Sequence, residues 1–218
     1  MPLLYDELFT CPNCSIIFQS KVLGGFNTFG KHYSDFYIGS QEDPQPILYE
    51  INICPKCGFS GFTIDLKSFS VDIELVQLAI EKVANFTGKK PSEFKAGDGY
   101  LVIANYLHNL NIEEKIGYYL KATYAYRELE DSMLESTRLE IINLIDEVLE
   151  KKKFVIQTKE FYLYLIGELY RLVGKTSESL MYFEKSLKIA NKKSLISKLV
   201  EHQLKNPMEV LPQDFLRT

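Results

Sequence analysis

The spacing of apolar residues changes near residue 68, and the change predicts two kinds of structure. Before it, residues 15–23 are rich in β-branched side chains, and residues 47–53 alternate apolar with polar or aromatic ones. Residues 62–66 can add a third, short strand. Such runs, when turn-forming residues such as Gly24-Gly25 interrupt them, are typical of β-strands. The pattern therefore predicts a small β-rich module over residues 1–68.

After residue 68, apolar residues recur every three or four positions, which is the period of an amphipathic helix. The first helix, of about four turns, carries its apolar residues between Ile73 and Ala84, with Asp72 near its start and Gly88 past its end. Further helices are predicted over 98–109, 112–129, 132–151, 157–173, 176–190 and 194–205. The expected fold is α+β and mostly α, with a helical domain over residues 69–218.

Length and composition are those of a globular protein. The chain has 218 residues, of which 46% are hydrophobic, and its net charge is −4. These values allow one or two domains with a sizeable core. The sequence has no run of about 18 apolar residues that could span a membrane. Its first residues lack the pattern of a signal peptide.

Four cysteines form two C-x-x-C pairs, Cys11-Pro12-Asn13-Cys14 and Cys54-Pro55-Lys56-Cys57, with 39 residues between the pairs. Each two-residue gap lets both sulfurs of one turn reach a single ion, and two such turns supply a tetrahedral set. We therefore predict one structural Zn²⁺ per chain. Gly58 can adopt the positive φ that turns backbone N–H groups toward sulfur, whereas Ser15 occupies the matching place in the first turn.

Two other uses of the cysteines, disulfides and thiol redox chemistry, are alternatives to zinc. Disulfides need an oxidising compartment, for which no export signal is apparent. A thiol redox protein needs one reactive pair at the start of a helix, whereas this sequence has two similar pairs in turns. Redox function remains an alternative. Four cysteine ligands leave no coordination position for water or substrate, so the predicted zinc is structural rather than hydrolytic.

Many aromatic residues lie in the first module, and such rings can stack on nucleic-acid bases. Residues 1–64, however, hold three Lys or Arg against six Asp or Glu, a net charge of −3. A negative module lacks the electrostatic attraction that dominates nucleic-acid affinity. Packing around the metal is therefore favoured, and nucleic-acid binding is kept only as an alternative.

Residues 160–191 resemble a tetratricopeptide repeat (TPR), and residues 99–126 resemble one more weakly. The residues that carry the stronger resemblance are Leu163, Ile166, Gly167, Tyr170, Gly174, Ser179, Phe183 and Ser186. The resemblance implies a helix pair that stacks on neighbouring helices and binds a protein or peptide. Helix aromatics such as Phe161 and Tyr164 are interpreted as packing residues, with a peptide groove as the alternative. An open groove lined by exposed tyrosines would favour peptide binding, and a filled one would not.

No catalytic motif is recognisable. The sequence lacks the phosphate-binding patterns G-x-x-x-x-G-K-[ST] and G-x-G-x-x-G, and also H-E-x-x-H and G-x-S-x-G. Its carboxylates show no spacing that selects an acid/base pair. The three histidines, His32, His108 and His202, are interpreted as surface or packing residues. The protein is therefore not expected to be an enzyme.

The whole arrangement resembles an uncharacterised bacterial family, domain-of-unknown-function family 2225. The resemblance rests on the two C-P-x-C pairs, the intervening Asp35-Phe36, Pro46 and Tyr49, Gly58, and the helices that follow. It implies a cytoplasmic bacterial protein and supplies no activity. The leading hypothesis is a non-enzymatic adaptor that contains zinc and binds a protein or peptide of unknown identity through TPR-like helices. The sequence does not name the binding residues.

Overall fold

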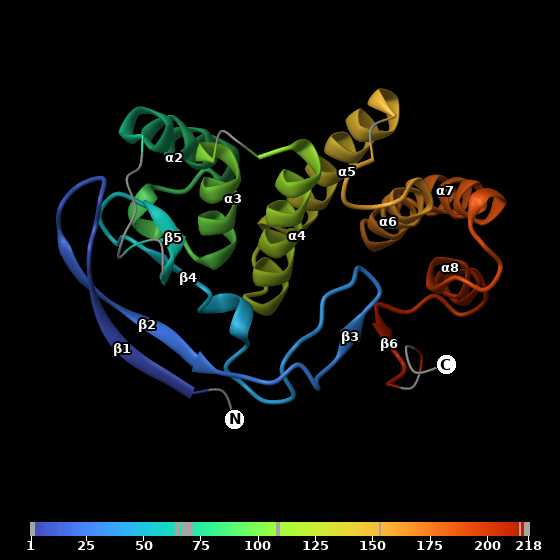
Figure 1. Ribbon diagram of the computed structural model, residues 1–218, viewed down its shortest axis with the longest axis horizontal. Coiled ribbons are helices and arrows are strands. Elements are labelled where there is room, and N and C mark those ends of the chain that lie inside the picture. The colour runs from blue at the N-terminus through green and yellow to red at the C-terminus, as the bar shows by residue number, and fades with distance from the viewer. Residues whose placement is uncertain are drawn as a thin grey trace. The chain divides into compact units, whose positions relative to one another are not determined.

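The structure, a computed structural model, describes residues 3–63, 66, 72–107, 110–152, 154–213 and 215. Within these residues it contains seven α-helices and three two-stranded antiparallel sheets (Figure 1). The protein is therefore α+β and mostly α, which confirms the predicted class. Among the described helices, none is long and apolar enough to cross a membrane.

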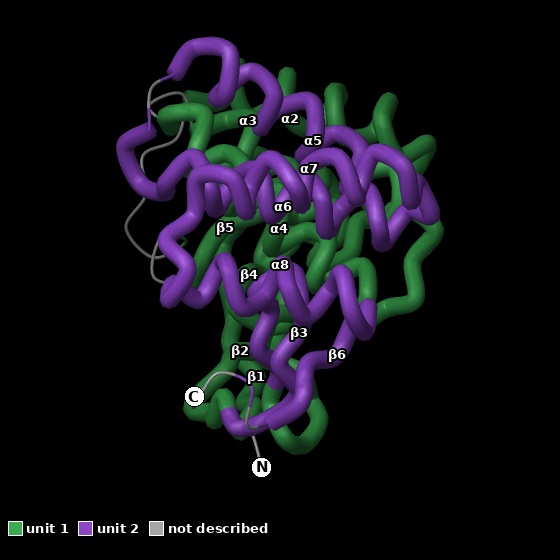
Figure 2. The backbone as a smooth tube through the Cα atoms, turned by 90° about the vertical axis from the view of Figure 1, so that its right-hand side faces the viewer, with its two compact units in different colours: residues 1–28, 40–137 green, residues 29–39, 138–218 purple. Residues whose placement is uncertain are grey.

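Residue contacts divide the chain into two compact units, which Figure 2 shows in different colours. Unit 1 comprises Met1–Thr28 and Ser40–Thr137, and unit 2 comprises Phe29–Gly39 and Arg138–Thr218. A short N-terminal segment is thus grouped with the C-terminal helices. The module boundary predicted between residues 68 and 69 falls outside the described residues and stays a prediction.

Unit 1 contains two β-hairpins. In the first, β1 (Leu3–Thr10) pairs with β2 (Ile17–Gly25), and in the second, β4 (Ile51–Ile53) pairs with β5 (Ser60–Phe62). The strands expected over 15–23 and 47–53 are confirmed where they overlap β2 and β4. The strand expected over 62–66 begins earlier, at β5, and residues 64 and 65 lie outside the described part of the chain.

Two local features of the hairpins differ from the prediction. Strand β1 was not foreseen, because Asp6 and Glu7 interrupt its apolar residues; in the structure, Asp6 faces Lys21 across the hairpin, with 3.1 Å between carboxylate oxygen and ammonium nitrogen. Residues 47 and 48 belong to the 3₁₀ helix η1 (Pro46–Leu48) rather than to a strand. Pro46 favours this start because its ring fixes φ at a helical value.

Three helices of unit 1 follow the predicted ranges closely: α2 (Ile73–Thr87), α3 (Ala96–Tyr106) and α4 (Ile112–Glu128). The Asp72 carboxylate caps α2 by accepting hydrogen bonds from two backbone amides of its first turn. Gly88, in the left-handed conformation, ends the helix. The sequence signals at both ends of α2 are thereby confirmed.

Helix α3 is buried along nearly its whole length and supports the second hairpin. The Tyr106 hydroxyl donates to the carbonyl oxygen of Ser60, at 3.1 Å. At Gly99 the helix comes so close to β4 that a Cβ atom would lie 2.7 Å from the Ile51 side chain. The second pair of cysteines is therefore carried by a hairpin that packs directly on a buried helix.

Unit 2 contains most of α5 (Met133–Lys151) and three further helices, α6 (Lys159–Leu172), α7 (Thr176–Ile189) and α8 (Leu195–Lys205). These confirm the helices predicted over 132–205. Two short strands complete the unit, since β3 (His32–Tyr33) pairs with β6 (Val210–Leu211). The core contains Tyr164, Phe183, Leu199, Val200 and Leu211.

Candidate metal centre

The two cysteine pairs occupy equivalent turns, one at the end of each hairpin. We call residues 11–15 knuckle 1 and residues 54–58 knuckle 2. In each knuckle, the amide of the first cysteine donates to a carbonyl five residues later, at 2.9 Å in knuckle 1 and 2.8 Å in knuckle 2. The residue after the second cysteine donates back to the carbonyl of the first cysteine, at 2.9 and 3.0 Å. The backbone therefore makes the same hydrogen bonds twice.

The residue that closes each knuckle has a positive φ, 60° at Ser15 and 74° at Gly58. Glycine adopts this left-handed conformation easily, whereas other residues pay a steric cost. The sequence showed Ser15 as a departure from the glycine expected there. In the structure, Ser15 adopts the conformation that Gly58 has, so the departure lies in the residue type and not in the shape of the turn.

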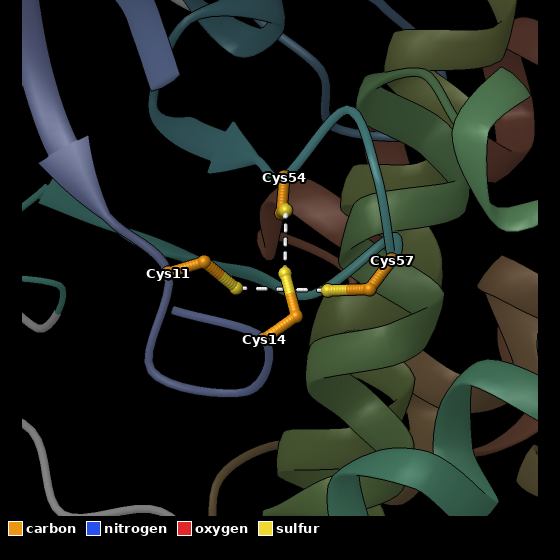
Figure 3. Close-up of side chains that lie close together, drawn as sticks. All are labelled: Cys11, Cys14, Cys54 and Cys57. Atoms are coloured by element: carbon orange, nitrogen blue, oxygen red, sulfur yellow. Dashed lines mark hydrogen bonds between the residues drawn. The ribbon is translucent and has the colours of Figure 1, made fainter. Parts of the chain in front are cut away.

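The four sulfur atoms converge in unit 1 (Figure 3). All lie within 4.8 Å of one another, and the Cys11–Cys57 and Cys14–Cys54 sulfurs are each 3.6 Å apart. Four ligands at Zn–S distances of about 2.3 Å on a tetrahedron would have sulfurs about 3.8 Å apart. The cluster therefore has the donor atoms and spacing to hold one metal ion, as the sequence predicts for these four residues.

The cluster is closed on one side and accessible on the other. Cys11 and Cys54, the first cysteine of each knuckle, are buried, whereas Cys14 and Cys57 are partly exposed. Cys57 also lines a surface cavity of about 430 Å³ together with Lys56. An ion can therefore reach the sulfurs from this side, which gives the site the entry path that a metal centre needs.

Burial determines how readily the thiols lose their protons in the absence of metal. It raises the pKa of the Cys11 and Cys57 thiols above the ordinary value. Burial acts in the same direction on Cys14, but hydrogen bonds with the Ile16 amide and the neighbouring thiols outweigh it, so the pKa of Cys14 is lowered. Because metals bind thiolates, an ion must displace protons from Cys11 and Cys57.

The arrangement is suited to holding an ion rather than to activating a substrate. Thiolates are soft ligands that favour zinc or iron–sulfur chemistry over calcium or magnesium. Four of them complete a tetrahedral coordination sphere, in which water or substrate is not needed as a ligand. Of the described histidines and carboxylates, none joins the cysteines in a metal-binding group. His108 lies outside the described residues.

Three aromatic residues of the two hairpins pack in the interior, whereas Phe26, directly after β2, is 52% exposed. Phe9 and Phe18 are buried and face each other across the first hairpin, with ring centroids 5.9 Å apart. Phe59, directly after knuckle 2, is buried against Tyr106 of α3. These three buried rings contribute apolar contacts beside the two knuckles.

The Asp35-Phe36 pair, which contributes to the family resemblance together with the cysteines, does not belong to the same compact unit as they do. Both residues belong to unit 2, where Asp35 is fully buried and the Phe36 ring stacks on Phe161 with centroids 4.8 Å apart. Tyr164 is also fully buried. The interpretation of this helix aromatic as a packing residue is therefore confirmed.

Sequence reasoning missed a buried charged cluster in unit 1. The Lys89 ammonium donates to both carboxylate oxygens of Asp98 at 3.1 Å and to Asp131 at 2.8 Å. The Tyr126 hydroxyl donates to Asp98 at 2.7 Å. Burial would lower the pKa of Lys89, but the two carboxylates outweigh it and raise that pKa. No sequence spacing indicates the cluster, because Lys89 and Asp131 lie in the connections between helices and meet Asp98 of α3 only in the folded structure.

Fold and site together define a mostly α-helical protein with a four-cysteine module that can hold a metal ion. The chain belongs to the family described as "Uncharacterized protein conserved in bacteria (DUF2225)", whose model matches residues 4–208. The resemblance noted from the cysteine pairs and helices is thereby confirmed. No curated protein and no solved structure matches the chain significantly.

Proposed function

We propose that this protein is a non-enzymatic adaptor in which one structural zinc ion organises unit 1 and TPR-like helices of unit 2 bind another protein or peptide. The observation that carries the zinc is the convergence of four thiol groups from two equivalent knuckles. The adaptor role rests on the helix pair α6–α7. No nucleic acid or membrane takes part in this proposal, and the protein acts in the cytoplasm.

The zinc supports unit 1 by joining two hairpins that are far apart in the sequence. Each hairpin alone has too little apolar area to be stable in water. Metal binding in small four-ligand sites contributes on the order of 10–16 kcal/mol at neutral pH. One ion shared by the two knuckles therefore fixes the hairpins in place relative to each other.

The helix pair α6–α7 supports the proposed binding role through its close packing. At Gly167 a Cβ atom would lie 2.6 Å from the Phe183 ring, so the two helices approach to a distance that only glycine allows. Ser186, also small and buried, donates its hydroxyl to the backbone carbonyl of Glu160, at 2.9 Å. These contacts fall at the small and aromatic positions that carry the TPR resemblance.

Affinity capture with the full chain as bait tests the adaptor role. We expect the bait to enrich a protein reproducibly at near-native concentration, and the purified protein to bind the chain in calorimetry. Gly167→Ala should weaken that binding at least tenfold, because the added methyl group meets the Phe183 ring.

The matched control is Gly117→Ala in α4, where nothing lies within 4 Å of the added carbon. This variant should bind the partner as the natural chain does. Absence of any enriched protein, or equal loss of binding in both variants, would refute the role assigned to α6–α7.

A further inference from the structure

The segment Phe29–Gly39, here called the resident segment, lies against one face of α6. In the sequence it is preceded and followed by residues of unit 1, yet its contacts assign it to unit 2. Ser34 and Asp35, at its centre, are both fully buried. The helical surface is therefore filled by a piece of chain that comes from elsewhere in the sequence.

The α6 face that receives this segment comprises Phe161, Tyr164, Glu168 and Arg171. Steps of three, four and three residues place these side chains on one side of the helix. The Phe36 ring lies between two aromatic rings, stacked on Phe161 at 4.8 Å and edge-on to Tyr164 at 5.4 Å. One aromatic side chain of the segment is thus clamped by the helix.

Polar contacts fix Ser34, which lies two residues before Phe36. The Tyr164 hydroxyl donates to the backbone carbonyl of Ser34 at 2.7 Å, and the Ser34 hydroxyl donates to the Glu168 carboxylate. Arg171 holds the same carboxylate through two hydrogen bonds, at 2.9 and 2.6 Å. Because Glu168 is fully buried, removing the hydroxyl would deprive a buried carboxylate of a donor, which is costly.

The backbone of the segment is also paired. His32 and Tyr33 form strand β3 beside β6, and the Ser34 amide donates to the carbonyl of Glu209 at 2.9 Å. Strand addition combined with side-chain pockets is a recurrent way in which proteins bind short peptides. The resident segment is therefore held as a linear peptide would be.

The resident segment has one strained residue. Phe36 has a φ of 71°, and the turn that imposes it is closed by hydrogen bonds from the Phe36 amide to Tyr33 and from the Tyr33 amide to Tyr37. A non-glycine residue in this conformation is strained. A peptide that presents the same side chains without this turn avoids the strain.

Building on the function proposed above, we propose that the α6 face recognises a linear Ser-Asp-Phe determinant, and that a partner protein carrying such a determinant binds by displacing the resident segment. In the resident segment, Ser34 supplies the hydroxyl group and Phe36 supplies the aromatic ring that contact the α6 face. A filled surface disfavours simple docking of a peptide, so binding proceeds by exchange of one segment for another.

Fluorescence anisotropy of the labelled peptide that spans residues 29–39 tests the exchange. The full chain carrying Phe36→Ala has a weakened resident segment and should bind this peptide at least tenfold more tightly than the natural chain. The same peptide carrying Ser34→Ala or Phe36→Ala should bind at least tenfold more weakly. If the Phe36→Ala chain loses its folded circular-dichroism signal, the milder Ser34→Ala chain replaces it.

A folded variant that shows no peptide binding up to about 1 mM, which corresponds to roughly 4 kcal/mol, would overturn the inference, because the segment would then be a permanent part of the core. Equal binding of the natural and altered peptides would overturn it as well. The adaptor proposal is tested separately. If affinity capture found no partner although the peptide displaced the resident segment, the adaptor proposal would fail and this inference would stand.

Discussion

Knuckle 1 and knuckle 2 reach the same backbone conformation with different residues. Ser15 and Gly58 have φ values of 60° and 74°, and each donates its amide to the carbonyl of the first cysteine in its knuckle. The shape of the turn is therefore imposed by the hairpin and the convergence of the sulfurs, and not by the preference of the closing residue. Glycine makes that shape less costly without being required for it.

The surroundings of knuckle 2 add a second reason that favours glycine there. A Cβ atom at Gly58 would lie 2.9 Å from the Phe94 ring and 3.0 Å from Pro91. Ser15 is exposed, so its side chain extends into solvent. Knuckle 1 thus tolerates a side chain at a modest conformational cost, whereas in knuckle 2 packing excludes one.

The largest effect is expected from removing a ligand. Cys54→Ser should abolish tight zinc binding and unfold the hairpin module, because the buried Cys54 position cannot recruit water as a substitute ligand. Most of the helical signal should remain. Metal analysis after dialysis, with limited proteolysis and circular dichroism, measures these effects.

The partly exposed Cys14 provides the comparison. Cys14→Ser should also lose affinity, but water can take the vacant position, so partial zinc occupancy is expected. Full zinc occupancy and unchanged resistance to proteolysis in Cys54→Ser would contradict the assignment of the ligands.

The second-largest effect is expected from a change in pH, which should alter the affinity for zinc. Because burial raises the pKa of the Cys11 and Cys57 thiols, zinc must displace at least these two protons near neutral pH. Its affinity should therefore rise about a hundredfold per pH unit between roughly pH 6 and 8, at about tenfold per displaced proton. Competition with a zinc-binding dye at several pH values measures this slope.

The metal-free protein should show the opposite trend in stability. A raised folded-state pKa stabilises the fold below the unfolded thiol pKa of about 8.5, and this contribution is lost as the pH rises further. Thermal unfolding with zinc should thus improve from pH 6 to 8, whereas unfolding with a chelator should worsen above about pH 8.5. If the thermal stability changed with pH in the same way with zinc and with the chelator, displacement of protons by zinc would be contradicted.

A smaller loss of stability is expected from substituting glycines with positive φ, and two such variants distinguish the contribution of packing from that of backbone strain. Gly58→Ala should cost about 2–4 kcal/mol, because it combines an unfavourable positive φ with contacts to Phe94 and Pro91. Gly88→Ala has the same φ strain, at 70°, but nothing lies within 4 Å, so it should cost only about 1 kcal/mol. Denaturant unfolding of the zinc-loaded variants measures both, and equal losses would show that packing at knuckle 2 is unimportant.

The four-cysteine cluster and the helices could be predicted from sequence because their signals are local. A C-x-x-C spacing brings two sulfurs together within one turn, and the helix period, Asp72 and Gly88 mark helix α2 within a few residues. Strand β1 escaped prediction because the ion pair between Asp6 and Lys21, which offsets its acidic residue, forms only after the hairpin closes.

Interactions between distant segments had no such signal. Lys89 and Asp131, in two connections between helices, meet Asp98 of α3 only in the folded structure, and the sequence interpretation found no carboxylate pair. Similarly, Asp35-Phe36 stands between the cysteine pairs in the sequence, yet Phe36 packs on Phe161 of unit 2. The spacing of the cysteines thus indicated their cluster, whereas nothing in the sequence indicated that Phe36 packs on Phe161.

The smallest effect concerns the knuckle that tolerates a side chain. Ser15→Gly should stabilise the zinc-loaded protein by about 0.5–1 kcal/mol, because relief of the left-handed strain exceeds the extra backbone entropy of glycine in the unfolded chain. Thermal unfolding should show this as a rise of about 2–4 °C per kcal/mol. Ser20→Gly in strand β2, the matched control, should instead destabilise the protein by about 0.5–1 kcal/mol. If both substitutions destabilised the protein equally, Ser15 would be serving the knuckle through its side chain, and the two knuckles would differ in more than the cost of one residue.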